Sequence, residues 1–166
     1  MDCSNVHRHT ASVQATIRPA ATEDLAEVMA LLEQLAPSWH PEDPKPAVTQ
    51  GATSIWHKIL ADERRVLLVA DDAGALIGLV DVVVVQTLLD GCVPHAIIDG
   101  LVVEKRLRGT GVGRALIGAA HAVAVEVGCC RMELLSSKEQ TGAHAFYRTV
   151  GFTMAAEGFR ADLTER

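Results

Sequence analysis

The stretch from Ala96 to Val127 reads AIIDGLVV, then EKRLRGTGVG, then RALIGAAHAVAVEV. Its apolar beginning, Ala96 to Val103, predicts a short buried strand. Its last part repeats apolar residues every three or four positions, which predicts a helix that ends at Gly128 in a left-handed turn. His121 lies opposite the apolar stripe of this helix and is predicted to be exposed. The stripe consists of Val112, Leu116, Ala119, Ala120, Val123 and Val127.

The turn between this strand and helix contains the residue types that bind a phosphate. The first N–H groups of a helix lack partners within the helix, and the helix dipole makes that end positive. Glycines allow a close backbone approach and a positive φ, and arginines add charge. We therefore expect a phosphate or pyrophosphate site, although a plain tight turn would use the same glycines. The predicted site comprises Arg108, Gly109, Thr110, Gly111, Val112, Gly113 and Arg114.

The spacing of these residues excludes two common phosphate motifs. A P-loop requires Gly-Lys-Ser/Thr, which is absent, and Arg114 stands where the dinucleotide motif has its last glycine or alanine. The pattern present, Arg-x-x-Gly-x-Gly from Arg108 to Gly113, resembles the acyl-coenzyme A pyrophosphate loop of the GNAT N-acetyltransferase superfamily. Arg114 has two open roles, because it can reach a phosphate or cover the outside of its helix.

A second motif of the same family follows near the end of the chain. Residues Glu133 to Phe152 resemble a strand, a polar turn and then Asn-x-x-Ala-x-x-Leu/Phe-Tyr-x-x-x-Gly-Phe. Gln140 replaces the usual asparagine, which puts one coenzyme contact in doubt. The resemblance extends from about Ala15 to Phe159. It implies an α/β (α+β) fold with a mixed, mostly antiparallel central sheet, splayed between two parallel strands and flanked by helices.

The resemblance also implies a role for each matching residue, with acetyl-CoA as co-substrate and no metal. The backbone of Leu101, Val102 and Val103 is expected to bind the pantetheine arm and the thioester carbonyl. Residues 108–114 are expected to bind the pyrophosphate, and Gln140 and Ala143 to lie along the pantetheine.

Two residues are candidates for the catalytic steps. Tyr147 matches the family's tyrosine near the thioester sulfur, a general acid, although it could simply pack beside Phe146 and Phe152. Asp99 matches an acidic position often found on the family's central strand and is the candidate base, directly or through water. A structural carboxylate inside the sheet is the alternative for Asp99. His144 is expected to be partly buried and hydrogen-bonded rather than in contact with the acyl group.

The expected function is transfer of an acetyl group from acetyl-CoA to a primary amine of a small molecule or protein. Because no cysteine lies in either motif, the amine is expected to attack directly in a ternary complex. A non-catalytic acyl-CoA-binding sensor domain is the alternative, and an interaction module without coenzyme is a third class. The sequence identifies neither the acceptor amine nor the oligomeric state, although a homodimer is compatible with it.

The remaining chain predicts further elements around the two motifs. We expect strands at Ala15–Arg18, Val66–Ala70, Ala75–Leu88, Cys130–Leu135 and Phe152–Ala155, with a possible bulge at Gly78. We expect helices from a Thr22 cap to Pro37, at Val48–Ala61 and at Ala143–Thr149. The four-proline segment Pro37–Pro46, with Trp39, His40, Glu42 and Asp43, is a substrate wall or a stiff connector.

Composition sets the broad class of the protein. The 166 residues suffice for one domain at 14–166, preceded by a disordered arm at 1–13. The net charge of −6 disfavours nucleic acid and would suit a cationic amine. The N-terminus resembles no signal peptide, and no apolar run is long enough for a membrane span, so we expect a cytoplasmic protein. Buried free thiols are expected for Cys3, Cys92, Cys129 and Cys130.

Overall fold

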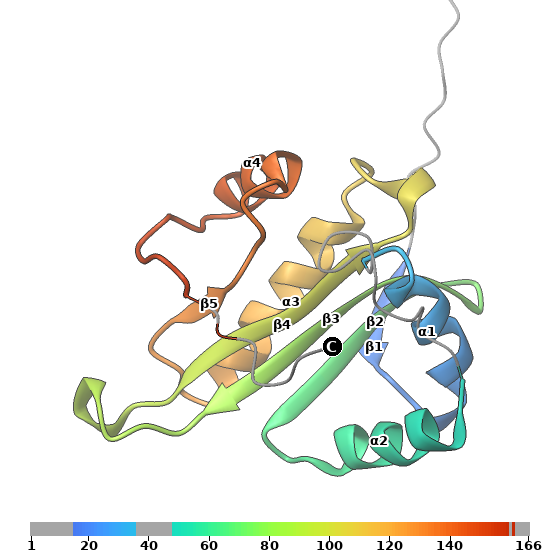
Figure 1. Cartoon of the computed structure of the whole chain (residues 1–166), viewed down its shortest axis with the longest axis horizontal. Coiled ribbons are helices and arrows are strands. Elements are labelled where there is room, and N and C mark those ends of the chain that lie inside the picture. Colours follow the sequence, from blue (N-terminus) through green and yellow to red (C-terminus); the bar gives the residue numbers. More distant parts are fainter. Residues whose placement is uncertain (1–14, 36–47, 160, 162–166) are drawn as a thin grey trace, which may run out of the picture.

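The computed structural model describes residues 15–35, 48–159 and 161 (Figure 1). The predicted arm at 1–13, Cys3 and the segment Pro37–Pro46 lie outside the described residues. No helix in the described part of the chain has the length and apolar character needed to cross a membrane.

A five-stranded sheet forms the centre of the fold, with its strands side by side in chain order. The first three neighbouring pairs are antiparallel, and the last pair is parallel. This confirms the predicted mixed, mostly antiparallel sheet with one parallel pair. The strands are β1 (Thr16–Pro19), β2 (Arg65–Asp72), β3 (Ala75–Val85), β4 (His95–Val103) and β5 (Met132–Leu134).

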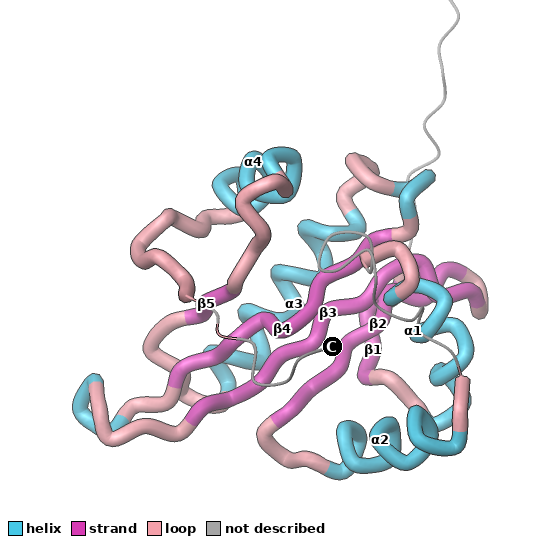
Figure 2. The backbone as a smooth tube through the Cα atoms, in the orientation of Figure 1, coloured by secondary structure: helices cyan, strands magenta, loops and turns pink. Residues whose placement is uncertain are grey.

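Helices cover both faces of this sheet (Figure 2). The helices α1 and α2 pack on one face, and α3 packs on the other. The N-terminus of α3 and the helix α4 lie at the same end of the molecule, at the top of Figure 1. The helices are η1 (Thr22–Asp24), α1 (Leu25–Leu32), α2 (Gln50–Ala61), η3 (Asp90–Cys92), η4 (Lys105–Leu107), α3 (Val112–Glu126) and α4 (Thr141–Thr149).

Two bulges decide which side chains of β3 and β4 face each layer. Side chains of a regular strand alternate between the two faces, and one extra residue reverses the alternation. In β4, Ile98 packs with the α3 layer whereas Val102 packs with α1 and α2, because the pairing register shifts at Asp99. In β3, the register shifts next to Gly78, as expected from the sequence. The bulge at Asp99 places this residue outside the regular ladder.

Gly78 is required because β3 passes close to the β4 backbone. A Cβ at this position would lie 2.9 Å from the carbonyl oxygen of Val102 and 3.1 Å from Cδ1 of Leu116. We expect Gly78→Ala to lower the free energy of unfolding by about 1–3 kcal/mol, as overpacking does. Urea unfolding measures this change. Gly118→Ala is the control, because its Cβ meets nothing within 4 Å and alanine favours a helix; equal effects of the two substitutions would contradict this reading.

Several sequence expectations about single elements were wrong. Thr22 makes no side-chain cap; instead the Asp24 carboxylate accepts a 2.7 Å hydrogen bond from the Ala21 N–H. Residues 152–155 form no strand, because the Phe152 N–H donates to the Tyr147 carbonyl and the chain turns at the end of α4. In α3, Ile117 and Ala124 are buried, whereas Val127, at the end of the helix, is exposed.

The burial of the cysteines was also predicted incorrectly where the structure describes them. Cys92 and Cys130 are exposed, and Cys129 is half-buried against the core on the α3 side of the sheet. All three are free thiols. Burial and the neighbouring Cys130 raise the pKa of the Cys129 thiol, which keeps it protonated and poorly reactive.

Candidate active site

The parallel pair β4–β5 separates after only three residues. Ala96, Ile97 and Ile98 pair with β5, but β4 continues to Val103 with no partner strand on that side among the described residues. A cleft of about 1170 Å³ extends along this open edge, between β4, the segment after β5 and the helices α1, α2 and α4. The predicted splay between the two parallel strands is therefore present and opens into a cavity of ligand size.

Three predicted residues of β4 line the open edge of this cleft. Val102 is buried, and Leu101 and Val103 are half-buried. The Nε of Arg108 donates to the Val103 carbonyl at 3.1 Å, so this carbonyl already has one side-chain partner. An extended ligand can bind to such an open strand edge as an additional strand would.

The glycine loop connects β4 to the N-terminus of α3 at one end of the cleft. Gly109 and Gly111 have φ of 81° and 102°, the left-handed region that favours glycine. A Cβ on either glycine would meet no atom of the described residues within 4 Å, so the backbone is open on that side. The Ala115 N–H donates to the Gly111 carbonyl, whereas the three amides at residues 112–114 have no acceptor among the described residues and can bind an anion. The loop therefore fits a pyrophosphate.

The seven residues of this loop differ in whether they line the cleft. The cleft is lined by Arg108, Gly109, Gly111, Gly113 and Arg114. The other two residues face away from it: the Thr110 hydroxyl donates to the Leu107 carbonyl, and Val112 lies in the core with 4% of its surface exposed.

Gly113 has a different role from the one that its spacing suggests. It has no positive φ, and its hypothetical Cβ would lie 3.2 Å from Cζ of Phe146. It therefore permits α4 to pack closely against the first turn of α3, and the expectation of a positive φ at all three glycines was wrong.

Arg114 contacts the end of α4. Its guanidinium donates to the Thr149 carbonyl at 3.2 Å and to the Thr149 hydroxyl at 3.4 Å. A cation at a helix C-terminus is favourable because the dipole is negative there. Arg114 thus links α3 to α4 and also lines the cleft.

The second motif forms the opposite wall of the cleft. Gln140 precedes α4, and Gln140, Ala143 and Tyr147 all line the cavity. Tyr147 packs against Phe146 and Phe152 with ring centroids 5.6 and 5.9 Å away, and burial raises its pKa. The phenol is therefore protonated near neutral pH and can donate a proton. His144 is half-buried and does not line the cleft.

Asp99 projects from the bulge into the cleft and belongs to a cluster of three charged residues. Its side chain is 63% exposed, and one of its carboxylate oxygens accepts a 3.0 Å hydrogen bond from Arg65. The Nε of Arg65 also donates to both carboxylate oxygens of Asp81, at 2.9 and 3.0 Å. Burial raises the pKa of Asp81, while its contacts with Arg65 act in the opposite direction. Asp99 is thus accessible from the cleft while it also accepts a hydrogen bond from Arg65 of β2, so both a catalytic and a structural role are compatible with its position.

Sequence reasoning missed Arg65, Asp81 and the bulge at Asp99. A lone carboxylate in the apolar run Leu79–Val85 was one available signal for Asp81. The Asp-Gly pair inside an apolar strand was an available signal for the bulge. Arg65, at the start of β2, has no local signal, because its role depends on the pairing of β2 with β3.

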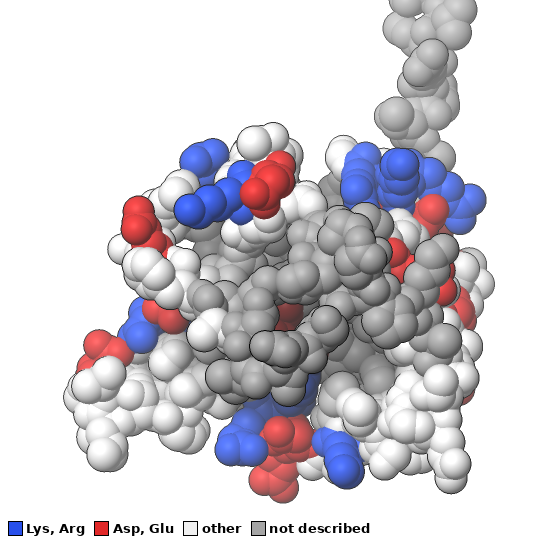
Figure 3. All heavy atoms as spheres, in the orientation of Figure 1, with Lys and Arg blue, Asp and Glu red and all other residues white. Residues whose placement is uncertain are grey.

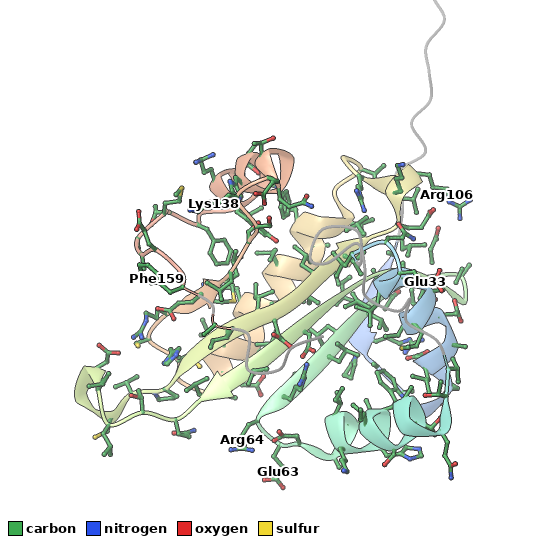
Figure 4. The ribbon with its side chains drawn as sticks, in the orientation of Figure 1. Glu33, Glu63, Arg64, Arg106, Lys138 and Phe159 are labelled. Atoms are coloured by element: carbon green, nitrogen blue, oxygen red, sulfur yellow. The ribbon has the colours of Figure 1, made fainter. Side chains whose placement is uncertain are left out.

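Basic side chains gather at the end of the molecule that contains the glycine loop. Figure 3 shows Lys and Arg over η4, and Figure 4 places Arg106 there and Lys138 on the turn before α4. No group of three or more His, Cys, Asp or Glu that could hold a metal occurs within residues 15–35, 48–159 and 161.

Comparisons with known proteins agree with this fold. The model of the acetyltransferase (GNAT) family matches residues 27–152. A proposed acetyltransferase from Agrobacterium tumefaciens is 28% identical, with a TM-score of 0.80 over 89% of this chain and 99% of that one. A comparison with curated proteins gave no match.

Two further solved structures share the fold at lower identity. Glucosamine-6-phosphate N-acetyltransferase from Arabidopsis thaliana is 20% identical, with a TM-score of 0.76 over 90% of this chain and 99% of that one. An aminoglycoside N-acetyltransferase in complex with CoA is 24% identical, with a TM-score of 0.70 over 92% of this chain and 94% of that one. At these identities, the likeness concerns the fold alone.

Proposed function

The chain belongs to the GNAT acetyltransferase family, and from this premise we propose that it transfers an acetyl group from acetyl-CoA to a primary amine. The amine attacks the thioester directly in a ternary complex. One observation carries the proposal: a single cleft is lined by the glycine loop, the open edge of β4 and Tyr147.

In our proposal, acetyl-CoA lies along the cleft in one direction. The pyrophosphate binds the amides at the start of α3, and the pantetheine follows the open β4 edge from Val103 toward Leu101, with Gln140 and Ala143 on the opposite wall. The thioester then lies near Tyr147. The aminoglycoside N-acetyltransferase of similar fold was solved with CoA, which supports the choice of coenzyme.

Deprotonation of the acceptor is the first chemical requirement. An alkyl amine has a pKa of about 10.4, so roughly one molecule in a thousand is nucleophilic near pH 7.4, equivalent to ~4 kcal/mol of barrier. Asp99, accessible in the cleft, accepts this proton directly or through water in our proposal. The neutral amine then attacks the thioester carbonyl and forms the C–N bond. The nitrogen loses its second proton to water, and collapse of the tetrahedral intermediate breaks the C–S bond.

The thiolate leaving group requires less acid–base catalysis than the amine nucleophile. A thiol has a pKa of about 8.5, so the thiolate is a fair leaving group and Tyr147 assists by donating its phenol proton. We expect Tyr147→Phe to lower kcat by about 10- to 100-fold, at the low end of general-acid effects. Steady-state thiol release at saturating acetyl-CoA measures this change.

Phenylalanine keeps the ring contacts with Phe146 and Phe152, so the fold and the Kd for acetyl-CoA should remain unchanged. An unaltered kcat across the pH range would exclude the phenol from the reaction and leave Tyr147 a packing role.

A thiol-release assay with a panel of amines, combined with calorimetry, tests the proposed function. Acetyl-CoA should bind, and at least one amine should release CoA. Binding without thiol release for any amine would favour the non-catalytic sensor, and no binding of acetyl-CoA would favour an interaction module. A cytoplasmic location and a homodimer remain predictions from the sequence.

A further inference from the structure

The part of the cleft beyond the thioester is mostly apolar. It is lined by residues of α1 and α2, the two helices on the right side of Figure 1. Side chains of both helices line it, including Leu25, Met29, Leu32, Ile55, Trp56 and Ile59. We call these six residues the apolar wall. A ligand that binds here must present an apolar surface of its own to gain from the contact.

Among the described residues, the charged groups in this part of the cleft are confined to one place. Five charged side chains line the whole cleft in the described part of the chain, and Arg108 and Arg114 belong to the coenzyme end. The other three are Arg65, Asp81 and Asp99, which contact one another. With both carboxylates ionised, this cluster has a net charge of −1.

The cluster can pair with one ammonium group. Both Asp81 oxygens accept hydrogen bonds from Arg65, whereas Asp99 uses only one of its oxygens for Arg65. The second oxygen of Asp99 has no partner among the described residues, and its side chain is 63% exposed. A primary ammonium that enters the cleft can donate to this oxygen, which places its nitrogen beside the candidate base.

We infer that the acceptor is a monoamine with an apolar body, such as an alkyl or arylalkyl amine, rather than a polyamine or an amino sugar. The inference rests on the proposed function. Its physical basis is the apolar wall, which can bury hydrocarbon but offers no partner to a second ammonium group. Burying an unpaired charge is unfavourable, so a second cation on the acceptor should weaken binding.

A series of linear amines tests the apolar wall by length. Each buried methylene contributes about fourfold to affinity, so kcat/KM should rise about fourfold per carbon from propylamine to hexylamine. 1,6-Diaminohexane has the length of hexylamine and one more charge, and its kcat/KM should be at least tenfold lower. A flat series, or a preference for the diamine, spermidine or kanamycin, would overturn the inference.

A matched pair of variants connects this selectivity to the cleft. Ile55 and Val125 are 58% and 60% exposed on different helices, and only Ile55 lines the cleft. Ile55→Glu should reduce the preference for hexylamine over 1,6-diaminohexane at least tenfold, because the new carboxylate can pair with the second ammonium. Val125→Glu should leave the preference unchanged. Equal effects of the two variants would contradict a role for the apolar wall.

The outcomes separate this inference from the proposed function. Thiol release with kanamycin or spermidine, and none with alkylamines, overturns the inference and leaves the acetyltransferase intact. If acetyl-CoA binds but no amine releases thiol, calorimetry of the same alkylamines with the CoA complex tests the inference. An affinity that rises with chain length supports binding at the apolar wall, and no binding of any alkylamine overturns the inference. No binding of acetyl-CoA refutes the proposed function itself.

Discussion

Asp99→Asn is expected to lower kcat/KM for an alkyl amine by about 100-fold or more, the usual contribution of a general base. Asparagine has nearly the same shape and still accepts a hydrogen bond from Arg65, but it cannot take a proton from the ammonium. Stability should change little, because Asp99 is 63% exposed and exposed ion pairs contribute little. Initial rates with purified, folded protein measure the loss.

If Asp99 is the catalytic base, a second result is expected that a structural role does not predict. An acceptor whose amine is already neutral at the assay pH, such as trifluoroethylamine, needs no proton removed before attack. The loss caused by Asp99→Asn should therefore be much smaller for this acceptor than for hexylamine. Asp72→Asn, outside the cleft, is the control and should change neither rate. Equal losses for both acceptors would assign Asp99 a structural role.

The other large effect concerns the glycine loop. Gly111→Val is expected to raise the Kd for acetyl-CoA by at least 100-fold, or about 2.7 kcal/mol. Gly111 has φ 102°, which a β-branched residue does not adopt without strain, and its Cβ would project into the space proposed for the pyrophosphate. The loss corresponds to one or two charge-assisted hydrogen bonds. Gly118→Val, on the exposed face of α3, is the matched control and should leave the Kd unchanged.

Local patterns in the sequence predicted much of this fold. The glycine loop, the helix α3 and the helix α4 combine short-range signals: an apolar period, a basic glycine turn and a terminating glycine. Gly111 and Gly128 have the positive φ that their positions suggested. The parallel pair β4–β5 follows from a strand, a helix and a strand with a short return.

Features that depend on contacts between distant residues were not predicted. Arg65 contacts Asp81 and Asp99 only because three strands lie side by side, and no local signal indicates this. The spacing of Gly113 in the motif predicts a glycine that contacts the ligand, but the close packing of Phe146 of α4 explains why no side chain fits at this position. The expected strand at 152–155 failed for the same reason, since strand propensity does not specify a partner.

The central claim is that the positive N-terminus of α3 binds the diphosphate of acetyl-CoA. The most direct test is calorimetry of acetyl-CoA and S-acetylpantetheine, which lacks the diphosphate, with the wild-type protein and with Gly111→Val. The wild-type protein should bind acetyl-CoA at least 100-fold more tightly than S-acetylpantetheine, and Gly111→Val should remove most of this difference while remaining folded. Equal affinities of the wild-type protein for the two ligands would contradict the account.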